Sequence, residues 1–375
     1  MIQKLLKLDD FILKVLVTGA HLAPEFGNTV QEIEADGVPI AVRIPILKVL
    51  TQPATTADTV AYALSAFSGW LQMEKPDGVL LLGDRYEIFA AAQAAAFAGI
   101  PIAHISGGDV TQGAADCVTK MAHLHFPSCE VYARRLVRMG EFPETVFNVG
   151  GLGDENIRTL PKMGRQELSE SLGFDLSGPF GLVTFHPETA GGVSPTAQMD
   201  QLLKAMSQIG QDSPIRWLIT KANADAGGAE INQKIDEWVA RRQGRAIAFT
   251  SLGVKRYLSA MALAAVVVGN SSSGVVETPT FGVPTVNIGR RQEGRLICEN
   301  VYCCPAEAGA ITQALNRVLS PEFAARARAA KSPYNGGDTS GCIVKILEEK
   351  LFEPGFGAPK GFYDGPVRLQ GEETR

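Results

Sequence analysis

The sequence lacks an excess of basic residues, and this argues against a nucleic-acid partner. Its 375 residues include 35 Lys and Arg against 40 Asp and Glu, a formal net charge of −5. Proteins that bind DNA or RNA usually present a basic face, because they must neutralise many phosphates. The arginines here occur instead in short patches, and this pattern suits a small phosphate ligand better than a polymer.

The chain also lacks the paired cysteines of a metal ribbon or of a disulfide framework. Its six cysteines include no CxxC pair, and only Cys303 and Cys304 are adjacent. Scattered single thiols fit a reducing compartment. His123 and His125 form an HxH pair that could bind a metal, but no third ligand lies within sequence reach. We therefore expect both histidines to be structural.

No stretch of the sequence is typical of a secretion signal or a membrane span. Asp9 and Asp10 interrupt the apolar N-terminal region, so it does not resemble a signal peptide. Residues 88–105 contain no Asp, Glu, Lys or Arg, but Gly99 and Pro101 divide them into an alanine-rich helix and a short strand. We expect a cytoplasmic protein without a membrane partner.

Strand-like and helix-like segments alternate along the chain. Strand patterns cover residues 12–18, 79–82, 100–105, 146–149, 180–185, 216–220, 246–250, 266–268 and 285–288. Helical patterns cover residues 59–73, 86–98, 131–139, 196–209, 230–242 and 254–263. This alternation predicts an α/β fold with parallel sheets. A polar passage, residues 155–179, marks a domain boundary, so we expect two Rossmann-like domains that face each other across a cleft.

A serine-rich loop follows one of these strands. Residues 266–268 are valines, residues 269–274 read Gly-Asn-Ser-Ser-Ser-Gly, and a helix is expected next. Hydroxyls and backbone N–H groups at the start of a helix favour anion binding. Glu277 would lie in the first turn of this helix, where its carboxylate could accept from ribose hydroxyls. The alternative is structural: the loop caps the helix and Glu277 complements the helix dipole.

The next predicted strand, residues 285–288, leads into an arginine-rich loop, residues 290–295. Ligands of parallel sheets bind at the carboxyl ends of the strands. One strand end with hydroxyls beside another with guanidiniums suits a nucleotide diphosphate.

Carboxylates follow two strands of the first half. Asp84 comes shortly after the strand at 79–82, and Asp109 and then Asp116 follow the strand at 100–105. Three carboxylates at one edge of a sheet would repel each other and raise the pKa of one of them, as acid/base chemistry requires.

Asp84 also has a structural alternative. Asp84 and Glu87 have the spacing of a capping box at the start of the alanine-rich helix. Arg85, between them, could meet a phosphate group.

Two histidines occupy different positions relative to their strands. His186 comes at the carboxyl end of the strand at 180–185 and is followed by Pro187, so we expect it to titrate in the cleft. His104 lies within a strand, and we expect it to point into the core and to be satisfied by a carbonyl group.

With these residues placed, the chain resembles the UDP-N-acetylglucosamine 2-epimerase family, in particular its hydrolysing branch. The similarity extends from about residue 21 to residue 347. Its most specific parts are residues 18–22, 83–87, 104–109, 119–121 with His123 and His125, 186–189, 269–289 and 291–292. The resemblance implies two Rossmann-like domains in the GT-B arrangement. It divides the chain into residues 1–160, 175–335, and a final helix and tail, 336–375, that cross back to the first domain.

The resemblance also implies site residues and a reaction. It makes Asp84, Asp109, Asp116 and His186 the catalytic candidates, and it makes Arg85, Ser271, Ser272, Glu277 and Arg291 the UDP contacts. The implied reaction removes the C2 proton with loss of UDP and then adds water to a 2-acetamidoglycal, releasing the C2-inverted sugar. We expect no metal or redox cofactor. We expect the protein to form a homodimer or a homotetramer.

Two departures from the family pattern leave other functions open. The family's opening Gly-Thr-Arg loop has no counterpart here, since the first predicted strand ends at Thr18. Only Cys117 and Val118 separate Asp116 from Thr119, so a segment with an Arg-His pair is missing. A UDP-sugar-binding homologue without turnover is therefore one alternative. A GT-B glycosyltransferase is another, although the motifs at residues 83–85 and 104–108 do not favour it.

Overall fold

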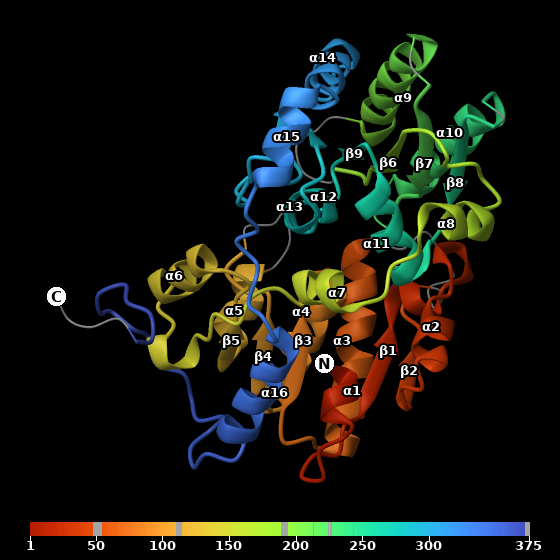
Figure 1. Cartoon of the computed structure of the whole chain (residues 1–375). Helices are drawn as coiled ribbons and strands as arrows, with labels where there is room; N and C mark the ends of the chain where they lie inside the picture. The colour runs from red at the N-terminus through yellow and green to blue at the C-terminus, as the bar shows by residue number, and fades with distance from the viewer. Residues whose placement is uncertain are drawn as a thin grey trace. The chain divides into compact units, whose positions relative to one another are not determined.

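Strands and helices alternate along the chain as the sequence predicts, and they are divided between two units (Figure 1). The computed structural model describes residues 1–47, 55–109, 115–188, 194–212, 214–223, 225, 227–242 and 244–371. Unit 1 consists of Met1–Pro24, Asn28–Glu155 and Pro333–Arg375, and unit 2 of Glu25–Gly27 and Asn156–Ser332. The chain passes from unit 1 to unit 2 at residue 155, close to the predicted boundary.

Unit 1 contains two parallel sheets. Strand β1 (Val15–Thr18) pairs with β2 (Ile40–Ile44), and β4 (Ile102–Ile105) lies between β3 (Val79–Leu82) and β5 (Leu124–Phe126). The helices of this unit are α1 (Ile2–Leu5), α2 (Val30–Ala35), α3 (Thr56–Glu74), α4 (Tyr86–Phe97), α5 (Ala115–Met121), α6 (Glu130–Arg138) and α16 (Thr339–Lys350), and α7 (Leu152–Thr159) leads out of it.

Helices α3 and α4 pack against each other and share one hydrophobic core with the strands of unit 1. Helix α3 begins with a capping box, in which Thr55 and Asp58 satisfy each other's backbone N–H groups. Ala90, Ala92 and Ala94 of α4 are buried in this core. A small-residue face of this kind could also serve as an oligomer contact, but much of it is already used inside unit 1. An oligomer therefore stays a prediction without this support.

Unit 2 contains one six-stranded parallel sheet in the order β11-β10-β9-β6-β7-β8. Its strands are β6 (Phe180–Thr184), β7 (Arg216–Thr220), β8 (Ala246–Phe249), β9 (Val266–Gly269), β10 (Thr285–Ile288) and β11 (Val301–Cys304). Its helices are α8 (Arg165–Leu172), α9 (Pro195–Asp212), α10 (Gly228–Ala240), α11 (Gly253–Leu263), α12 (Ser273–Val276), α13 (Thr278–Phe281), α14 (Ala308–Val318) and α15 (Pro321–Ala329). The strand order runs outward in opposite directions from β6 and β9, so the topological switch point lies between these two strands.

The structure corrects the sequence-based elements in three places. The strand predicted at 146–149 contributes only an isolated bridge between Val146 and His125. Strands β2 and β11 were not predicted. The helix expected after the serine loop is instead two four-residue helices, α12 and α13, with Glu277 between them. Pro279 has no backbone N–H to donate, which explains why one helix does not continue through this point.

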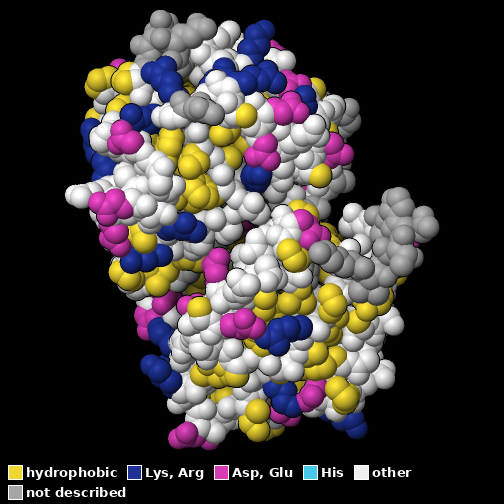
Figure 2. Space-filling model, turned by 90° about the vertical axis from the view of Figure 1, so that its right-hand side faces the viewer, with side chains coloured by type: hydrophobic (Ala, Val, Ile, Leu, Met, Phe, Trp, Pro, Cys, Tyr) yellow, Lys and Arg dark blue, Asp and Glu magenta, His cyan; other side chains and the backbone are white. Residues whose placement is uncertain are grey.

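Charges of both signs are mixed over the face that Figure 2 shows, rather than sorted into a basic region. Among the described residues, none of the helices combines the length and the apolar character that crossing a bilayer requires. All six cysteines lie in the described part of the chain and are free thiols.

Candidate functional site

Three loops of unit 2 meet at the carboxyl edge of its sheet. They follow β6, β9 and β10, which are neighbours in the order β10-β9-β6, and Thr184 of β6 is in register with Gly269 of β9. His186 therefore follows β6 at the switch point, directly beside the serine loop that follows β9. The sequence predicted this neighbourhood from strand ends alone.

Asn270 joins the loop after β9 to the loop after β6. Its Oδ1 accepts a hydrogen bond from the backbone N–H of His186 at 2.7 Å, and its Nδ2 donates to the carbonyl of His186 at 2.8 Å. Asn270 is fully buried. The preceding Gly269 has a φ of +138°, and a Cβ there would lie 1.9 Å from the carbonyl oxygen of Thr184. Only glycine permits this close approach, which brings Asn270 within reach of His186.

The ring of His186 is oriented by a backbone donor. The N–H of Asn223, in the loop after β7, donates to Nδ1 of His186 at 3.2 Å. Since Nδ1 accepts, the proton of the neutral imidazole belongs on Nε2. A neutral imidazole in this tautomer has an N–H at Nε2 to donate. The catalytic role of His186 stays a prediction.

The hydroxyls of the serine loop form a short chain with a partly buried tyrosine. Ser271 Oγ lies 3.0 Å from Ser273 Oγ, which lies 2.6 Å from the hydroxyl of Tyr257. Ser272 is the N-cap residue of α12, but its side chain makes no capping hydrogen bond. The structural alternative, in which the loop caps the helix, thus has no capping side-chain bond from Ser272 to support it, and α12 has only four residues.

Glu277 lies between α12 and α13 rather than in the first turn of a continuous helix. Burial raises the pKa of its carboxyl to about 7. Burial also raises the pKa of Tyr257 to about 12, and the nearby charge of Glu277 adds to this effect. The carboxyl of Glu277 therefore titrates near neutral pH, and a donor that favours its ionised form would lower its pKa.

Arg291 is held over the serine loop by its backbone and by its side chain. Glu188 Oε1 accepts from the backbone N–H groups of Arg290 at 2.7 Å and of Arg291 at 2.9 Å. The guanidinium of Arg291 donates to the carbonyl of Asn270 at 3.2 Å. Sequence reasoning missed Glu188 as a supporting residue. The sequence feature that could have revealed Glu188 is a carboxylate two residues after His186, in a loop rather than in a helix.

Two of the predicted carboxylates follow adjacent strands of unit 1. Leu82 of β3 is in register with Ile105 of β4, so Asp84 and Asp109 leave the same edge of that sheet. His104 Nε2 lies 2.9 Å from the carbonyl oxygen of Gly83, so a side chain of β4 contacts the loop after β3. The prediction that His104 is a core histidine satisfied by a carbonyl is confirmed.

The capping box suggested for Asp84 and Glu87 is not formed. Arg85 is the N-cap residue of α4, without a capping side-chain bond, and its guanidinium donates to Glu87 at 3.2 and 3.3 Å. The guanidinium of Arg85 is thus bonded to Glu87 of the same turn, and this contact does not by itself indicate a phosphate-binding role. The UDP contact predicted for Arg85 stays a prediction.

Asp116 is exposed in the first turn of the seven-residue helix α5. Residues 110–114, which join it to Asp109, lie outside the described residues, as does Thr189 of the 186–189 motif. The expected coupling of the three carboxylates therefore stays a prediction.

Arg135 of α6 is a further residue that sequence reasoning missed. Its Nη1 donates to the carbonyl of Gly108 at 2.7 Å, immediately before Asp109. Its guanidinium also lies 5.4 Å from the centre of the Tyr132 ring. The sequence feature that could have revealed Arg135 is its position three residues after the buried Tyr132, which places both on the same helix face. An arginine from α6 thus contacts the loop that carries Asp109.

The two predicted structural histidines have partners within unit 1. His123 Nδ1 accepts from the backbone N–H of Ile102 at 3.3 Å, and His125 Nε2 lies 2.9 Å from a carboxylate oxygen of Glu141. Within the described ranges, no group of three His, Cys, Asp or Glu side chains is arranged to hold a metal ion. Both histidines thus have the hydrogen-bond partners within unit 1 that a structural role requires.

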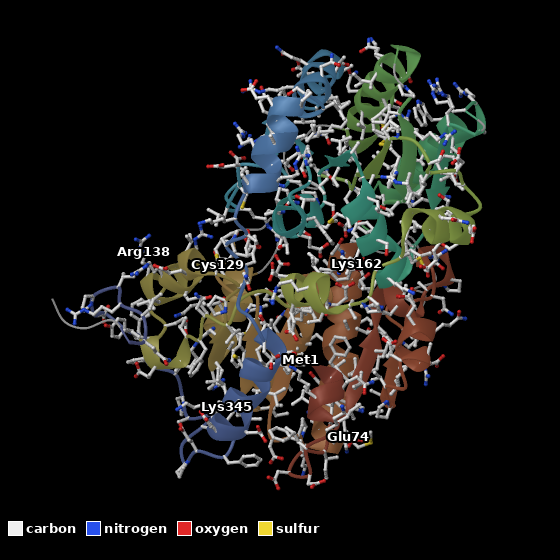
Figure 3. All side chains as sticks on the ribbon, in the orientation of Figure 1. Met1, Glu74, Cys129, Arg138, Lys162 and Lys345 are labelled. Carbon is white, nitrogen blue, oxygen red and sulfur yellow. The ribbon has the colours of Figure 1, made fainter. Side chains whose placement is uncertain are left out.

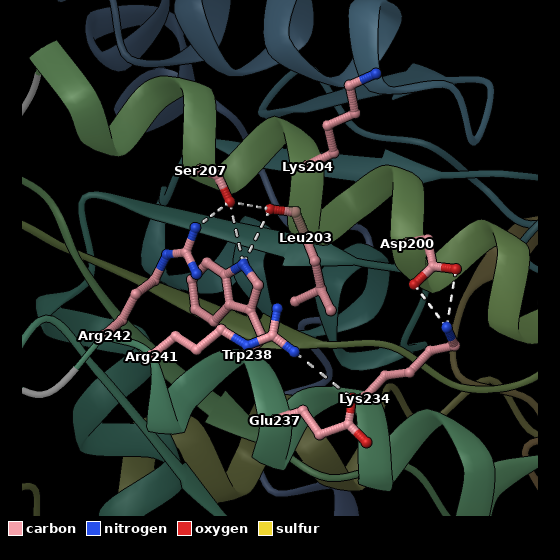
Figure 4. Close-up of a pocket in the computed structure, with 9 residues that line it drawn as sticks. All are labelled: Asp200, Leu203, Lys204, Ser207, Lys234, Glu237, Trp238, Arg241 and Arg242. Carbon is pink, nitrogen blue, oxygen red and sulfur yellow. Dashed lines mark hydrogen bonds and ion pairs between the residues drawn. The ribbon is translucent and has the colours of Figure 1, made fainter.

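A groove of about 430 Å³ lies between α9 and α10 of unit 2 (Figure 4). Arg242 stacks over Trp238 and donates to Ser207 at 2.5 Å, and Lys234 pairs with Asp200. None of the predicted site residues lines this groove. Two of its cations, Arg241 and Arg242, follow directly after α10, where they complement the helix dipole.

Two Rossmann-like parallel α/β units, one with a loop cluster at its strand-order switch point, define the class of this protein. It belongs to the UDP-N-acetylglucosamine 2-epimerase family, whose model matches residues 3–348. The resemblance stated from the motifs is confirmed.

Two relatives from the hydrolysing branch share about a third of their residues with this chain. The GDP/UDP-N,N'-diacetylbacillosamine 2-epimerase (hydrolyzing) of Campylobacter jejuni is 38% identical over 319 residues, 84% of this chain and 82% of the relative. The UDP-N,N'-diacetylbacillosamine 2-epimerase (hydrolyzing) of Legionella pneumophila is 32% identical over 323 residues, 85% of this chain and 84% of the relative.

Among solved structures, the UDP-GlcNAc 2-epimerase from Neisseria meningitidis bound to UDP-GlcNAc superimposes with a TM-score of 0.75. The two chains are 17% identical, and the match covers 93% of this chain and 95% of the other. The predicted fold class, α/β with two Rossmann-like domains as in the GT-B class, is confirmed.

Proposed function

We propose that this protein is a hydrolysing UDP-sugar 2-epimerase. The substrate would be a UDP-linked 2-acetamido sugar, and the products would be UDP and the free sugar with inverted configuration at C2. The observation that carries the proposal is the loop cluster of unit 2, in which His186, the serine loop and Arg291 are joined through Asn270.

In the proposed first step, a base removes the proton from C2 while the bond between C1 and the UDP oxygen breaks. The products of this step are UDP and a 2-acetamidoglycal. In the second step, water adds a hydroxyl group to C1, and C2 receives a proton on the opposite face. Asp84, Asp109, Asp116 and His186 are the candidates for these proton transfers.

The nucleotide would be bound by unit 2. Ser271 and Ser272 offer hydroxyls to the diphosphate, and Arg291 offers a guanidinium. Glu277 would accept hydrogen bonds from the ribose, which favour its ionised form. Arg85 of unit 1 would contact the diphosphate or the sugar. Stabilising the charge on the departing UDP lowers the barrier to breaking the C1–O bond.

The relatives suggest which sugar to test first. Both the Campylobacter and the Legionella relatives are named for N,N'-diacetylbacillosamine. We propose a UDP-linked diacetamido-trideoxy sugar of this kind as the preferred substrate, with UDP-N-acetylglucosamine as the alternative. Comparing kcat/KM for the two substrates tests this choice, and a higher value for UDP-N-acetylglucosamine would reject it.

The general proposal is tested by a proton NMR time course of each UDP-sugar with the protein in D2O. We expect UDP release, a C2-inverted sugar and one deuterium at C2 to appear together. UDP binding without any release of sugar would favour the alternative of a binding protein without turnover. Sugar transfer only in the presence of an acceptor would favour a glycosyltransferase.

A further inference from the structure

The C-terminal segment, residues 355–371, folds back onto unit 1 and inserts a lysine beside α5. Lys360 Nζ lies 2.6 Å from a carboxylate oxygen of Glu141. It also donates to the carbonyl oxygens of Thr119 and Lys120, at 3.1 and 3.3 Å. The Lys360 side chain is 21% exposed. This ammonium group therefore has three protein acceptors.

Glu141 is the centre of this cluster. It is 1% exposed, and besides Lys360 it contacts Lys120 Nζ at 2.7 Å and His125 Nε2 at 2.9 Å. Burial alone would raise the pKa of this carboxyl, but the hydrogen bonds from His125, Lys120 and Lys360 outweigh it and lower the pKa to about 2. The carboxylate is thus ionised at neutral pH and holds two ammonium groups in place.

Lys360 also satisfies the end of α5. Thr119 and Lys120 belong to the last turn of this helix, where backbone carbonyls lack their regular helical partners. The carbonyl of Thr119 also accepts from the backbone N–H of Ala122 at 3.1 Å. A cation at a helix C-terminus pairs with these carbonyls and with the negative end of the dipole. A helix of seven residues is too short to be stable on its own, so its position depends on tertiary contacts such as this one.

The segment around Lys360 is fixed by further contacts. The Phe362 ring lies against Gly140, where a Cβ would come within 2.4 Å of it, and 5.0 Å from Lys120 Nζ. The backbone N–H of Tyr363 donates to the carbonyl of Gly140 at 2.9 Å. Gln370 donates to the carbonyl of Pro143 at 3.1 Å. The lysine is consequently presented to α5 by an anchored backbone.

We propose that Lys360 is a positioning residue of the active site, which fixes α5 and thereby the carboxylate of Asp116 at the other end of this helix. The inference rests on the proposed function, because it assigns Asp116 a place in the reaction. The simpler explanation is that Lys360 only neutralises Glu141. Lys120 already pairs with Glu141, however, and neutralisation does not account for the two hydrogen bonds from Lys360 to α5.

The test compares Lys360→Met, Lys360→Arg and a control, Lys345→Met, in the full chain. Lys345 lies on α16, its side chain is 76% exposed, and it pairs only loosely with Glu349 (Figure 3). Three quantities are measured for each protein: the amide hydrogen exchange of α5, the kcat and KM for the UDP-sugar, and the stoichiometry and affinity of UDP binding by calorimetry. The UDP stoichiometry counts the molecules whose unit 2 is folded.

For Lys360→Met we expect α5 amides to exchange ~10-fold faster or more, because the helix loses its C-terminal partner. We expect kcat to fall ~10- to 100-fold with KM and UDP binding nearly unchanged, since a displaced Asp116 affects the reaction rather than the nucleotide. Lys360→Arg should recover most of the lost kcat, and Lys345→Met should match the unmutated protein. If Lys360→Met does not fold, Lys360→Gln is used in its place.

An unchanged kcat in Lys360→Met would overturn the inference, as would slow, unaltered exchange in α5. Faster exchange with unaltered kcat would show that the contact is only structural. If the unmutated protein binds UDP but turns over no UDP-sugar, the proposed function fails, and with it the catalytic part of the inference. The exchange data would then still decide whether Lys360 fixes α5.

Discussion

The two sheet edges that carry the candidate residues are built differently. In unit 2, six strands form one sheet, and Asn270 and Glu188 join its loops through hydrogen bonds to the backbone. In unit 1, five strands form two sheets, and the carboxylates lie on loops and on a seven-residue helix. Backbone-bonded loops are fixed whether or not a ligand is present. The unit 2 edge is therefore fixed by residues of its own loops, whereas the carboxylate edge depends on residues outside its loops, such as His104 of β4 and Arg135 of α6.

The largest expected effect is on turnover, and it distinguishes a catalytic role of the unit 2 edge from a role in nucleotide binding. His186→Ala should lower turnover by ~10²–10⁴-fold, the range for a lost acid/base group, while UDP affinity changes far less. Steady-state kinetics and calorimetry measure the two quantities. Asp84→Asn should behave similarly, and the double variant should be little worse than either single one. If His186→Ala retains more than half of the normal rate, His186 has no catalytic role.

Replacing Asn270, which joins the loops after β6 and β9, tests whether the unit 2 edge is fixed by its own loops. Asn270→Ala leaves the backbone N–H and C=O of His186 without their buried partner, so we expect unfolding to require ~2–4 kcal/mol less free energy. Urea denaturation measures this loss. Asn287→Ala is the matched control, because the Nδ2 of this buried asparagine makes only a 3.6 Å contact with Cys303. Equal losses in the two variants would contradict a special role for Asn270.

Arg291→Ala tests the edge as a UDP site. It should weaken UDP binding by ~1.5–3 kcal/mol, the range for a charge-assisted hydrogen bond. Arg290→Ala is the control, since Arg290 is 80% exposed and pairs with Glu293. Calorimetry with UDP measures both variants. Unaltered affinity in Arg291→Ala would remove this residue from the site.

The smallest effect concerns pH. Because burial raises the pKa of Glu277 from 4.5 to about 7, the folded protein holds a proton that the unfolded chain releases above pH 4.5. Stability should therefore fall between pH 4.5 and 7, relative to Glu277→Gln, and stay level above pH 7. Thermal denaturation of both proteins across this range measures the difference. Parallel curves would show that Glu277 does not titrate there.

The same residue should make nucleotide binding depend on pH. If ribose hydroxyls donate to the ionised carboxylate, affinity should decline as the pH falls below about 7. Uridine is the appropriate probe, because it has no phosphate that titrates in this range. Calorimetry should show this decline for the unmutated protein, and a flat profile for Glu277→Gln. A flat profile in both would exclude a ribose contact to the carboxylate.

The sequence predicted the unit 2 edge better than the unit 1 edge, for a physical reason. His186, the serine loop and Arg291 each follow a β-branched strand, and parallel strands bring their carboxyl ends together. Glu277 was misplaced because the break at Pro279 was not weighed. Arg135 was missed because it reaches the Asp109 loop from α6, and Lys360 because it reaches the end of α5 from the C-terminal segment. The spacing of Tyr132 and Arg135 places both on one helix face, but it does not show which loop they contact.

Unit 2 consists almost entirely of one continuous stretch, Asn156–Ser332, whereas unit 1 needs both ends of the chain. During synthesis, domains generally fold as units once their residues are available. Unit 2 can therefore complete its sheet while the C-terminal residues are still being added. Unit 1 must wait for α16, whose Ile343 and Leu347 pack with Phe126 of β5 in one core. The unit that begins first on the ribosome is thus the last to be finished.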